Sequence, residues 1–171
     1  HWPSPNNEVP MADYLTALKD VKAEGKARHI GISNFTCEQV DEAISILGKG
    51  EILTNQIEVH PFLQNRKLAE HCEHQGLQVT AFMPLAVGKV MEDPTLQKIA
   101  DAHGVTPAQI TLAWVNQRNM ITIPSSTKAR NIQSNIAAFD LVLSDSDMAD
   151  IAMLDRQERI ANPDFAPAWD E

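Results

Sequence analysis

The chain has 171 residues, with 23 acidic and 14 basic side chains and a formal net charge of −9 at pH 7. The hydrophobic fraction of 43% is too high for a disordered chain. The acidic balance argues against a general nucleic-acid binder, because phosphate neutralisation requires clustered Lys and Arg. No apolar run approaches the roughly 20 residues of a membrane span, and the first residues show no signal-peptide pattern.

The cysteines indicate the cellular compartment, and the chain length indicates the number of domains. Cys37 and Cys72 form neither a CxxC pair nor a disulfide framework, which favours a reducing compartment, and we expect the cytoplasm. The length suits one domain, so we expect residues 1–171 to form a single domain. The sequence opens on His1-Trp2-Pro3 without an initiator Met, and we therefore expect a portion of a longer protein.

Strand and helix patterns alternate along the chain. Helices are predicted at residues 11–25, 36–48, 66–75 and 93–104, then from Thr106, between Ser126 and about Ala138, and from Ser144. Strands are predicted at residues 28–33, 53–59, 77–82 and 120–123. The tail after Asn162, which mixes aromatic residues with proline, is predicted to be an extended loop.

Several helix starts carry recognisable capping signals. Thr36 and Thr106 are each followed three residues later by Gln, the pattern of a capping box. Asp93 precedes a proline in the first helical turn, and Gly104 is placed to end that helix. Ser144 is placed to cap the last helix.

This alternation favours an α/β fold with parallel strands joined by helical crossovers. A doubly wound sheet usually begins with a glycine-rich phosphate turn, and the sequence has no GxGxxG. A (β/α)8 barrel fits better, but a complete barrel takes about 250 residues and eight strands. Four predicted strands, with the end of a fifth at His1, therefore predict a partial (β/α)8 TIM-barrel fold.

Polar residues follow the predicted strands, where such barrels build their active sites. These strand-end loops are His1-Trp2-Pro3, Ser33-Asn34-Phe35, His60-Pro61, residues 82–85 and residues 124–128. The alternative is that Ser, Asn and Pro only terminate the strands.

The segment from Pro124 to Asn131 is the most informative of these loops. Small hydroxyl residues precede a helix start, and two cations, Lys128 and Arg130, lie in its first turn, where they oppose the helix dipole. An anion held by backbone N–H groups and these cations accounts for the pattern. A solvated helix cap with incidental charges is the alternative.

Two other groupings have structural interpretations that we favour. His71 and His74 lie three apart on a predicted helix without an obvious third ligand, so we expect a solvent-facing helix and no metal site. Glu58 and His60 share one face of a strand, and we expect a structural hydrogen-bonded pair in preference to a general-acid pair.

Several blocks together resemble the aldo-keto reductase family. They are His1-Trp2-Pro3, Gly31-Ile32-Ser33-Asn34-Phe35, Asn55-Gln56-Ile57-Glu58-Val59-His60-Pro61 and Pro124-Ser125-Ser126-Thr127. The resemblance covers the whole chain and about the last two thirds of a family member. The serine pair, residues 63–67 and the Pro-Ala-Trp-Asp ending are similar to a bacterial subgroup that reduces diketogluconate and methylglyoxal.

The resemblance implies a barrel that binds NADPH and reduces carbonyls to alcohols. His1 matches the active-site histidine that orients and polarises the substrate carbonyl, and Trp2 is expected to contact substrate. Ser33, Asn34 and Gln56 match the residues that hydrogen-bond the nicotinamide carboxamide.

The remainder of the implied cofactor site lies later in the chain. Its residues are Phe82, in the place of the ring that stacks on nicotinamide, Leu85 of the pyrophosphate loop, and Ser125, Ser126, Thr127, Lys128, Arg130 and Asn135. Asn135 takes the place of an adenine-contacting asparagine. Asn131 stands where the family frequently has a phosphate-binding arginine, so that role passes to Lys128 and Arg130.

The resemblance also implies a proton-donating tyrosine, with an aspartate and a lysine, on strands that precede His1. The one tyrosine of the chain, Tyr14, is expected on an outer helix with no route to a strand-end pocket. We therefore expect the chain alone to be inactive, since general acid catalysis typically supplies about 10²- to 10⁴-fold.

Three functions are compatible with these patterns. The first is NADPH-dependent reduction of small dicarbonyls such as methylglyoxal, or of keto sugars such as diketogluconate. The second is a non-catalytic nucleotide-binding or self-assembling half barrel, whose open edges pair with a second copy or with an N-terminal half. The third, an aldolase or isomerase of phosphorylated sugars, explains Ser125 and Ser126 but not Asn34 or Gln56.

Overall fold

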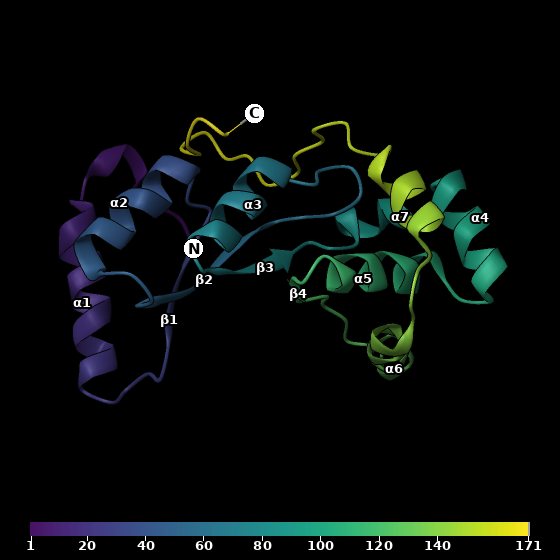
Figure 1. The fold of residues 1–171 in the computed structure, drawn as a ribbon, viewed down its shortest axis with the longest axis horizontal. Coiled ribbons are helices and arrows are strands. Elements are labelled where there is room, and N and C mark those ends of the chain that lie inside the picture. Colours follow the sequence, from purple (N-terminus) through teal and green to yellow (C-terminus); the bar gives the residue numbers. More distant parts are fainter. Residues whose placement is uncertain (171) are drawn as a thin grey trace. The chain divides into compact units, whose positions relative to one another are not determined.

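The computed structural model describes residues 1–170, and the chain divides into two compact units (Figure 1). The first unit contains residues 1–57, residues 66–80 and the tail from Ala161. The second contains residues 58–65 and 81–160. None of the helices in residues 1–170 combines the length and apolar character of a membrane span. That the chain forms a single domain stays a prediction.

The strands of the described residues form one sheet in the order in which they occur in the chain. They are β1 (Ile30–Ser33), β2 (Ile52–Glu58), β3 (Gln78–Phe82) and β4 (Ile121–Thr122). β1 and β2 are parallel, with Ser33 opposite Gln56. Every connection between neighbouring strands contains a helix, as parallel pairing requires. The predicted α/β class with helical crossovers is therefore confirmed.

Helices of the first unit pack side by side (Figure 1). They are α1 (Met11–Ala23), α2 (Cys37–Leu47) and α3 (Arg66–His74), preceded by the 3₁₀ helix η1 (Pro5–Asn7). α1 contacts α2, and α2 contacts α3. Leu15 and Val40 are fully buried between these helices and the strands, so the predicted apolar stripes form the core of this unit.

The second unit is built around α5 (Pro107–Gln117), whose residues 110–115 are all buried. Its other helices are η2 (Ala86–Met91), α4 (Pro94–His103), α6 (Ala129–Ala137), η3 (Ala138–Asp140) and α7 (Asp145–Ala152). α5 contacts α4, α6, η2 and η3, and α7 contacts α4. Trp114 is the largest fully buried side chain, with the Arg118 guanidinium 4.8 Å from its ring centroid.

The predicted caps are confirmed. Thr36, Thr106 and Ser144 each begin a helix through a reciprocal capping box. The Asp93 carboxylate accepts hydrogen bonds from the backbone N–H groups of Thr95 and Leu96, both at 3.0 Å. Gly104 ends α4 in the left-handed conformation, with φ of 66°.

The structure differs from the predicted elements mainly at their ends. β1 begins at Ile30, two residues later than predicted, and β4 is reduced to Ile121–Thr122. α1 ends at Ala23, before Gly25. The pattern did not predict η1 and η2, in which positive φ values at Asn6 and Val87 interrupt the helical geometry.

Close approach of β1 and β2 explains the glycine at position 31. A Cβ atom on Gly31 would lie 2.7 Å from the Thr54 Cγ2 atom and 3.1 Å from the Thr54 carbonyl oxygen. The Thr54 side chain is held in place because its hydroxyl shares a 2.8 Å hydrogen bond with that of Thr80. The backbone at position 31 therefore leaves no room for a side chain.

We expect Gly31→Ala to lower the free energy of unfolding by about 1–3 kcal/mol through overpacking. Thr54→Ser removes the methyl group in the shorter contact, so the double variant is expected to recover part of that loss. Thermal unfolding of the two single variants and the double variant measures this coupling. If the stability change of the double variant equalled the sum of the two single changes, the steric explanation would be contradicted.

Candidate functional site

Four of the predicted site residues line one cavity of the first unit. His1, Trp2, Ser33 and Gln56 surround a volume of about 410 Å³. Ser33 is the last residue of β1, and Gln56 lies two residues before the carboxyl end of β2, near the edge at which parallel sheets of this class bind ligands. The wall combines apolar residues, such as Ile32 and Phe35, with polar side chains, as is typical of small-molecule sites.

A hydrogen-bonded turn at the end of β1 organises this cavity. The Gln56 carbonyl oxygen accepts from the Ser33 hydroxyl at 2.7 Å and from the Asn34 backbone N–H at 2.9 Å. The buried Asn34 side chain donates from Nδ2 to the His1 carbonyl oxygen at 2.7 Å. Asn34 has φ of 60°, a left-handed conformation that asparagine tolerates better than most residues. The turn thereby fixes three predicted site residues and the backbone of His1.

The C-terminal tail also contributes to this region, which the sequence did not reveal. Trp2 is in edge-to-face contact with Phe165, at 5.6 Å between ring centroids, and with Trp169, at 6.0 Å. The tail was predicted only as an extended loop. Its two aromatic residues were the available signal, but periodicity cannot show which rings meet across more than 160 residues of chain.

The prediction that Tyr14 has no route to a strand-end pocket is wrong. Tyr14 lies on α1 and lines the same cavity as His1 and Ser33. The prediction was based on the position of Tyr14 on an outer helix. Because α1 packs directly against β1, Tyr14 lies next to the cavity at that strand. Burial raises the pKa of the phenol, a hydrogen bond from the Ser4 backbone opposes that rise, and nearby Glu42 adds to it. The raised pKa makes the phenolate harder to form.

The second unit has a cavity of its own, of about 400 Å³. Of the predicted residues, it is lined by Leu85 and Ser125, and its remaining lining is Met83, Pro84, Val87, Gly88, Ile123 and Pro124. Phe82 ends β3 just before this loop and is half-buried. The two loops that carry Leu85 and Ser125 are thus brought together, as their positions after β3 and β4 predict.

Backbone strain marks the loop after β3. Met83, Ala86 and Val87 all have positive φ values, of 49°, 47° and 54°. The last of these is unusual, since a β-branched residue is strongly disfavoured in this conformation. The Val87 side chain is 73% exposed, so core packing does not explain its strain. Strained backbone of this kind clusters at ligand sites.

The segment before α6 is open to solvent. Ser125, Thr127, Lys128 and Arg130 are exposed, and Ser126 and Asn135 are half-buried. Lys128 occupies the N-cap position of α6 and makes no capping hydrogen bond through its side chain. The Ser126 hydroxyl accepts only from the Lys128 backbone N–H, at 3.2 Å. The side chain at the N-cap therefore leaves the first backbone N–H groups of α6 uncapped, and both the anion site and the solvated helix cap stay predictions.

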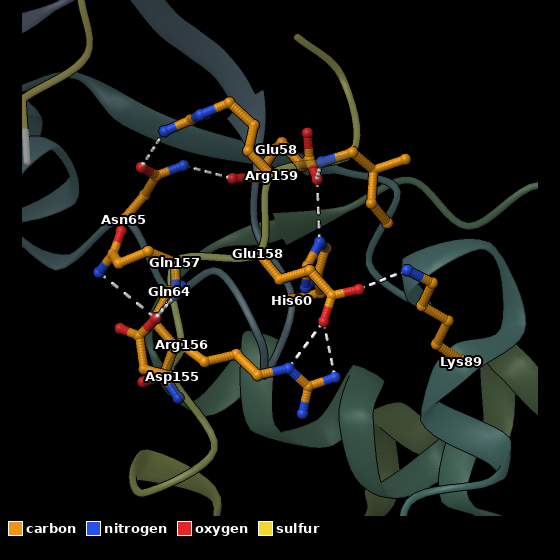
Figure 2. A network of polar contacts seen from close by, with 11 residues as sticks. Glu58, His60, Gln64, Asn65, Lys89, Asp155, Arg156, Gln157, Glu158 and Arg159 are labelled. Carbon is orange, nitrogen blue, oxygen red and sulfur yellow. Dashed lines mark hydrogen bonds and ion pairs between the residues drawn. The ribbon is translucent and has the colours of Figure 1, made fainter.

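Glu58 and His60 form the structural pair that the sequence favoured (Figure 2). Their side chains are 1% and 0% exposed, and Glu58 Oε1 lies 2.9 Å from His60 Nε2. The same carboxylate oxygen accepts from the Ile160 backbone N–H at 2.8 Å. Both groups are shielded from solvent and point into the protein, which argues against a general-acid role.

Around this pair, polar contacts fasten residues 155–160 to the loop after β2 (Figure 2). Asn65 donates to the Glu58 carbonyl oxygen at 2.6 Å and accepts from Arg159 at 3.2 Å. Glu158 receives ion-pair contacts from Lys89 and Arg156, which hold the pKa of its carboxyl below its usual range. Glu58 is the buried centre of this network.

We expect Glu58→Ala to lower the free energy of unfolding by about 3–5 kcal/mol, because it leaves His60 Nε2 and the Ile160 N–H buried without their acceptor. Glu58→Gln keeps one acceptor oxygen and should cost less. Chemical denaturation measures both, with Glu92→Ala, an exposed position of the same unit, as the control. A Glu58→Ala effect as small as that of Glu92→Ala would contradict this assignment.

The cysteines and the helix α3 histidines have ordinary surroundings. Burial raises the pKa values of the Cys37 and Cys72 thiols to about 11, so neither is a ready thiolate. His71 Nε2 lies 2.8 Å from Asp41 Oδ1 on the neighbouring helix α2. Within residues 1–170, no group of three or more potential ligands is arranged to hold a metal ion.

Comparisons with known proteins agree with this geometry. The model of the aldo/keto reductase family matches residues 1–156. Methylglyoxal reductase DkgB of Yersinia pestis is 49% identical over 171 residues, which are 99% of this chain and 64% of that protein. The chain therefore spans somewhat less than two thirds of the length of this curated relative.

Solved structures show the same likeness. A structure assigned as a 2,5-diketo-D-gluconic acid reductase B superposes with a TM-score of 0.94 at 40% identity, covering 100% of this chain and 61% of that one. A Gox0644 variant in complex with NADPH has a TM-score of 0.90 at 33% identity, covering 98% of this chain and 61% of that one. These likenesses confirm the predicted partial (β/α)8 type. The family match over most of the chain, together with the strand-end residues gathered at one cavity, places this protein in the aldo/keto reductase family.

Proposed function

We propose that this chain supplies the NADPH-binding and carbonyl-orienting part of an enzyme that reduces aldehydes and ketones to alcohols. The observation that carries this proposal is the cavity at the carboxyl ends of β1 and β2, where His1, Ser33 and Gln56 converge. The proposed substrates are small dicarbonyls such as methylglyoxal, or keto sugars such as diketogluconate. The names of the relatives in the comparisons support this substrate class.

The polar groups of this cavity fit a nicotinamide carboxamide. A carboxamide offers two N–H donors and one carbonyl acceptor, so it needs partners of both kinds. The Gln56 side-chain amide supplies both kinds from the cavity wall. Asn34 donates through Nδ2 to the His1 carbonyl oxygen, which leaves its Oδ1 as an acceptor. Ser33 donates to the Gln56 carbonyl oxygen and accepts from Asn34 Nδ2 at 3.3 Å, which leaves one lone pair of its hydroxyl as a further acceptor.

Taken by itself, the second unit offers a place for an anionic group such as a phosphate. The first turn of α6 presents backbone N–H groups without a side-chain cap, and Lys128 and Arg130 stand beside them. This combination suits an anion, which the helix N-terminus and the two cations both attract. Ser125, Ser126 and Thr127 supply hydroxyl donors. We assign Leu85 to the pyrophosphate loop, Asn135 to adenine and Phe82 to stacking on the nicotinamide.

The carbonyl-orienting role belongs to His1. Its imidazole can donate a hydrogen bond to the substrate oxygen, where negative charge develops as the carbonyl carbon is reduced. NADPH supplies the hydride when bound. Trp2, next in sequence, offers an apolar surface beside that oxygen. The Tyr14 phenol has a raised pKa and a hydrogen bond from the Ser4 backbone, so we assign it no acid role.

The direct experiment follows NADPH oxidation by the complete gene product with methylglyoxal and with diketogluconate. We expect turnover, and we expect His1→Ala to reduce kcat by roughly 10²- to 10⁴-fold. The exposed His29→Ala variant is the matched control and should retain wild-type rates. No NADPH consumption with any carbonyl would contradict the proposal. NADPH binding without turnover would favour the non-catalytic nucleotide-binding alternative.

Cofactor preference tests the two cations separately. We expect Lys128→Ala and Arg130→Ala each to weaken NADPH binding by about tenfold, because each removes a charge-assisted contact to phosphate. NADH binding should change little, since it lacks the additional phosphate. Fluorescence titration with both cofactors gives the ratio, and exposed Lys98→Ala is the control. Equal affinity of the wild-type protein for NADPH and NADH would exclude this assignment.

A further inference from the structure

The C-terminal tail is fastened to the start of α2 by Asp170. Its carboxylate Oδ2 accepts a hydrogen bond from the Cys37 backbone N–H at 2.9 Å. Cys37 is the first residue of α2, so this N–H has no partner within the helix. The capping box of Thr36 satisfies the Gln39 N–H instead. Asp170 therefore supplies an acceptor for the Cys37 N–H, which the Thr36 side chain does not satisfy. Its negative charge also suits the positive end of the helix dipole.

The same carboxylate also acts on the Cys37 thiol. Burial raises its pKa to about 11, and the charge of Asp170 and a hydrogen bond to its carboxylate add to the rise. Lys67, on α3, acts weakly in the opposite direction. The raised pKa keeps the thiol protonated at neutral pH.

The residues before Asp170 lie against the proposed substrate region. Trp169 precedes it directly, and the Trp169 indole Nε1 donates to Asn162 Oδ1 at 2.9 Å, which closes the tail on itself. Trp169 and Phe165 both meet the ring of Trp2 edge to face. Trp2 lines the cavity with His1 and is its neighbour in sequence. The ring of Trp2 is therefore held by a tail whose far end is fixed at α2.

We propose that Asp170 is a positioning residue for the carbonyl substrate, acting through the tail and Trp2. This inference rests on the proposed function. Asp170 touches neither substrate nor cofactor. Its contact with the α2 N-terminus holds Trp169 and Phe165 against Trp2, and the Trp2 ring then presents a fixed surface beside His1. Release of the tail leaves the cofactor residues Ser33 and Gln56 in place, because their contacts lie within the β1–β2 turn.

The test compares Asp170→Ala, Asp170→Asn and the control Asp164→Ala in the complete gene product. Asp164 is an exposed tail residue of the same charge. Two readouts are needed: acrylamide quenching of tryptophan fluorescence, which reports the tail without any turnover, and steady-state kinetics with methylglyoxal and NADPH. Thermal unfolding of each variant accompanies them.

We expect Asp170→Ala to increase quenching and to raise the KM for methylglyoxal by about tenfold, the effect of losing one hydrogen bond to a charged group. The dissociation constant for NADPH should stay the same. Asp170→Asn retains an acceptor oxygen and should show a smaller change in the same direction. Asp164→Ala should match the wild-type protein in every readout.

Two results would overturn the inference. Unchanged quenching in Asp170→Ala would show that the carboxylate does not hold the tail. Increased quenching with an unchanged KM, or a lowered unfolding temperature alone, would show a purely structural contact. Failure of the proposed function is distinguishable, because the wild-type protein would then not oxidise NADPH with any carbonyl while the quenching difference between variants would persist.

Discussion

The candidate site depends on the register of two parallel strands. Because Ser33 lies opposite Gln56, the Gln56 carbonyl oxygen receives both the Ser33 hydroxyl and the Asn34 N–H, and Asn34 in turn reaches the backbone of His1. A shift of either strand by one residue would turn that strand's side chains to the other face of the sheet and separate Ser33 from Gln56. Close packing of Gly31 on Thr54 excludes a side chain that would push these strands apart. Backbone pairing and one missing Cβ thus place groups that are more than 20 residues apart in sequence.

Buried or half-buried carboxylates hold two segments that have no regular secondary structure, the one around Ile160 and the C-terminal tail. Glu58, buried beside His60, anchors the backbone of Ile160, and Asp170 anchors the tail at the first residue of α2. Each carboxylate accepts from a backbone N–H that no regular element satisfies. Segments without secondary structure of their own can therefore be as firmly placed as helices. In this protein they carry the aromatic rings that meet Trp2.

Signals between neighbouring residues predicted most of the fold. They also predicted the part of the candidate site that lies at strand ends. The capping boxes at Thr36 and Thr106 and the Asp93 cap depend on neighbouring residues, so the sequence reveals them. The strand-end rule likewise predicted Ser33 near His1, and the family resemblance added Gln56, which lines the same cavity. The place of Tyr14 and the contact of Asp170 with Cys37 depend on how distant segments pack, which no local pattern encodes. The short β4 and the strained Val87 loop were missed for the same reason.

The central claim is that the turn joining Ser33, Asn34 and Gln56 receives the nicotinamide ring. A crystal structure of the complete gene product with NADP⁺ tests it most directly. The claim predicts the carboxamide within hydrogen-bonding distance of the Gln56 side chain and of Ser33 or Asn34, with the reactive carbon facing the side of His1. Electron density that places the nicotinamide away from the ends of β1 and β2 would contradict it.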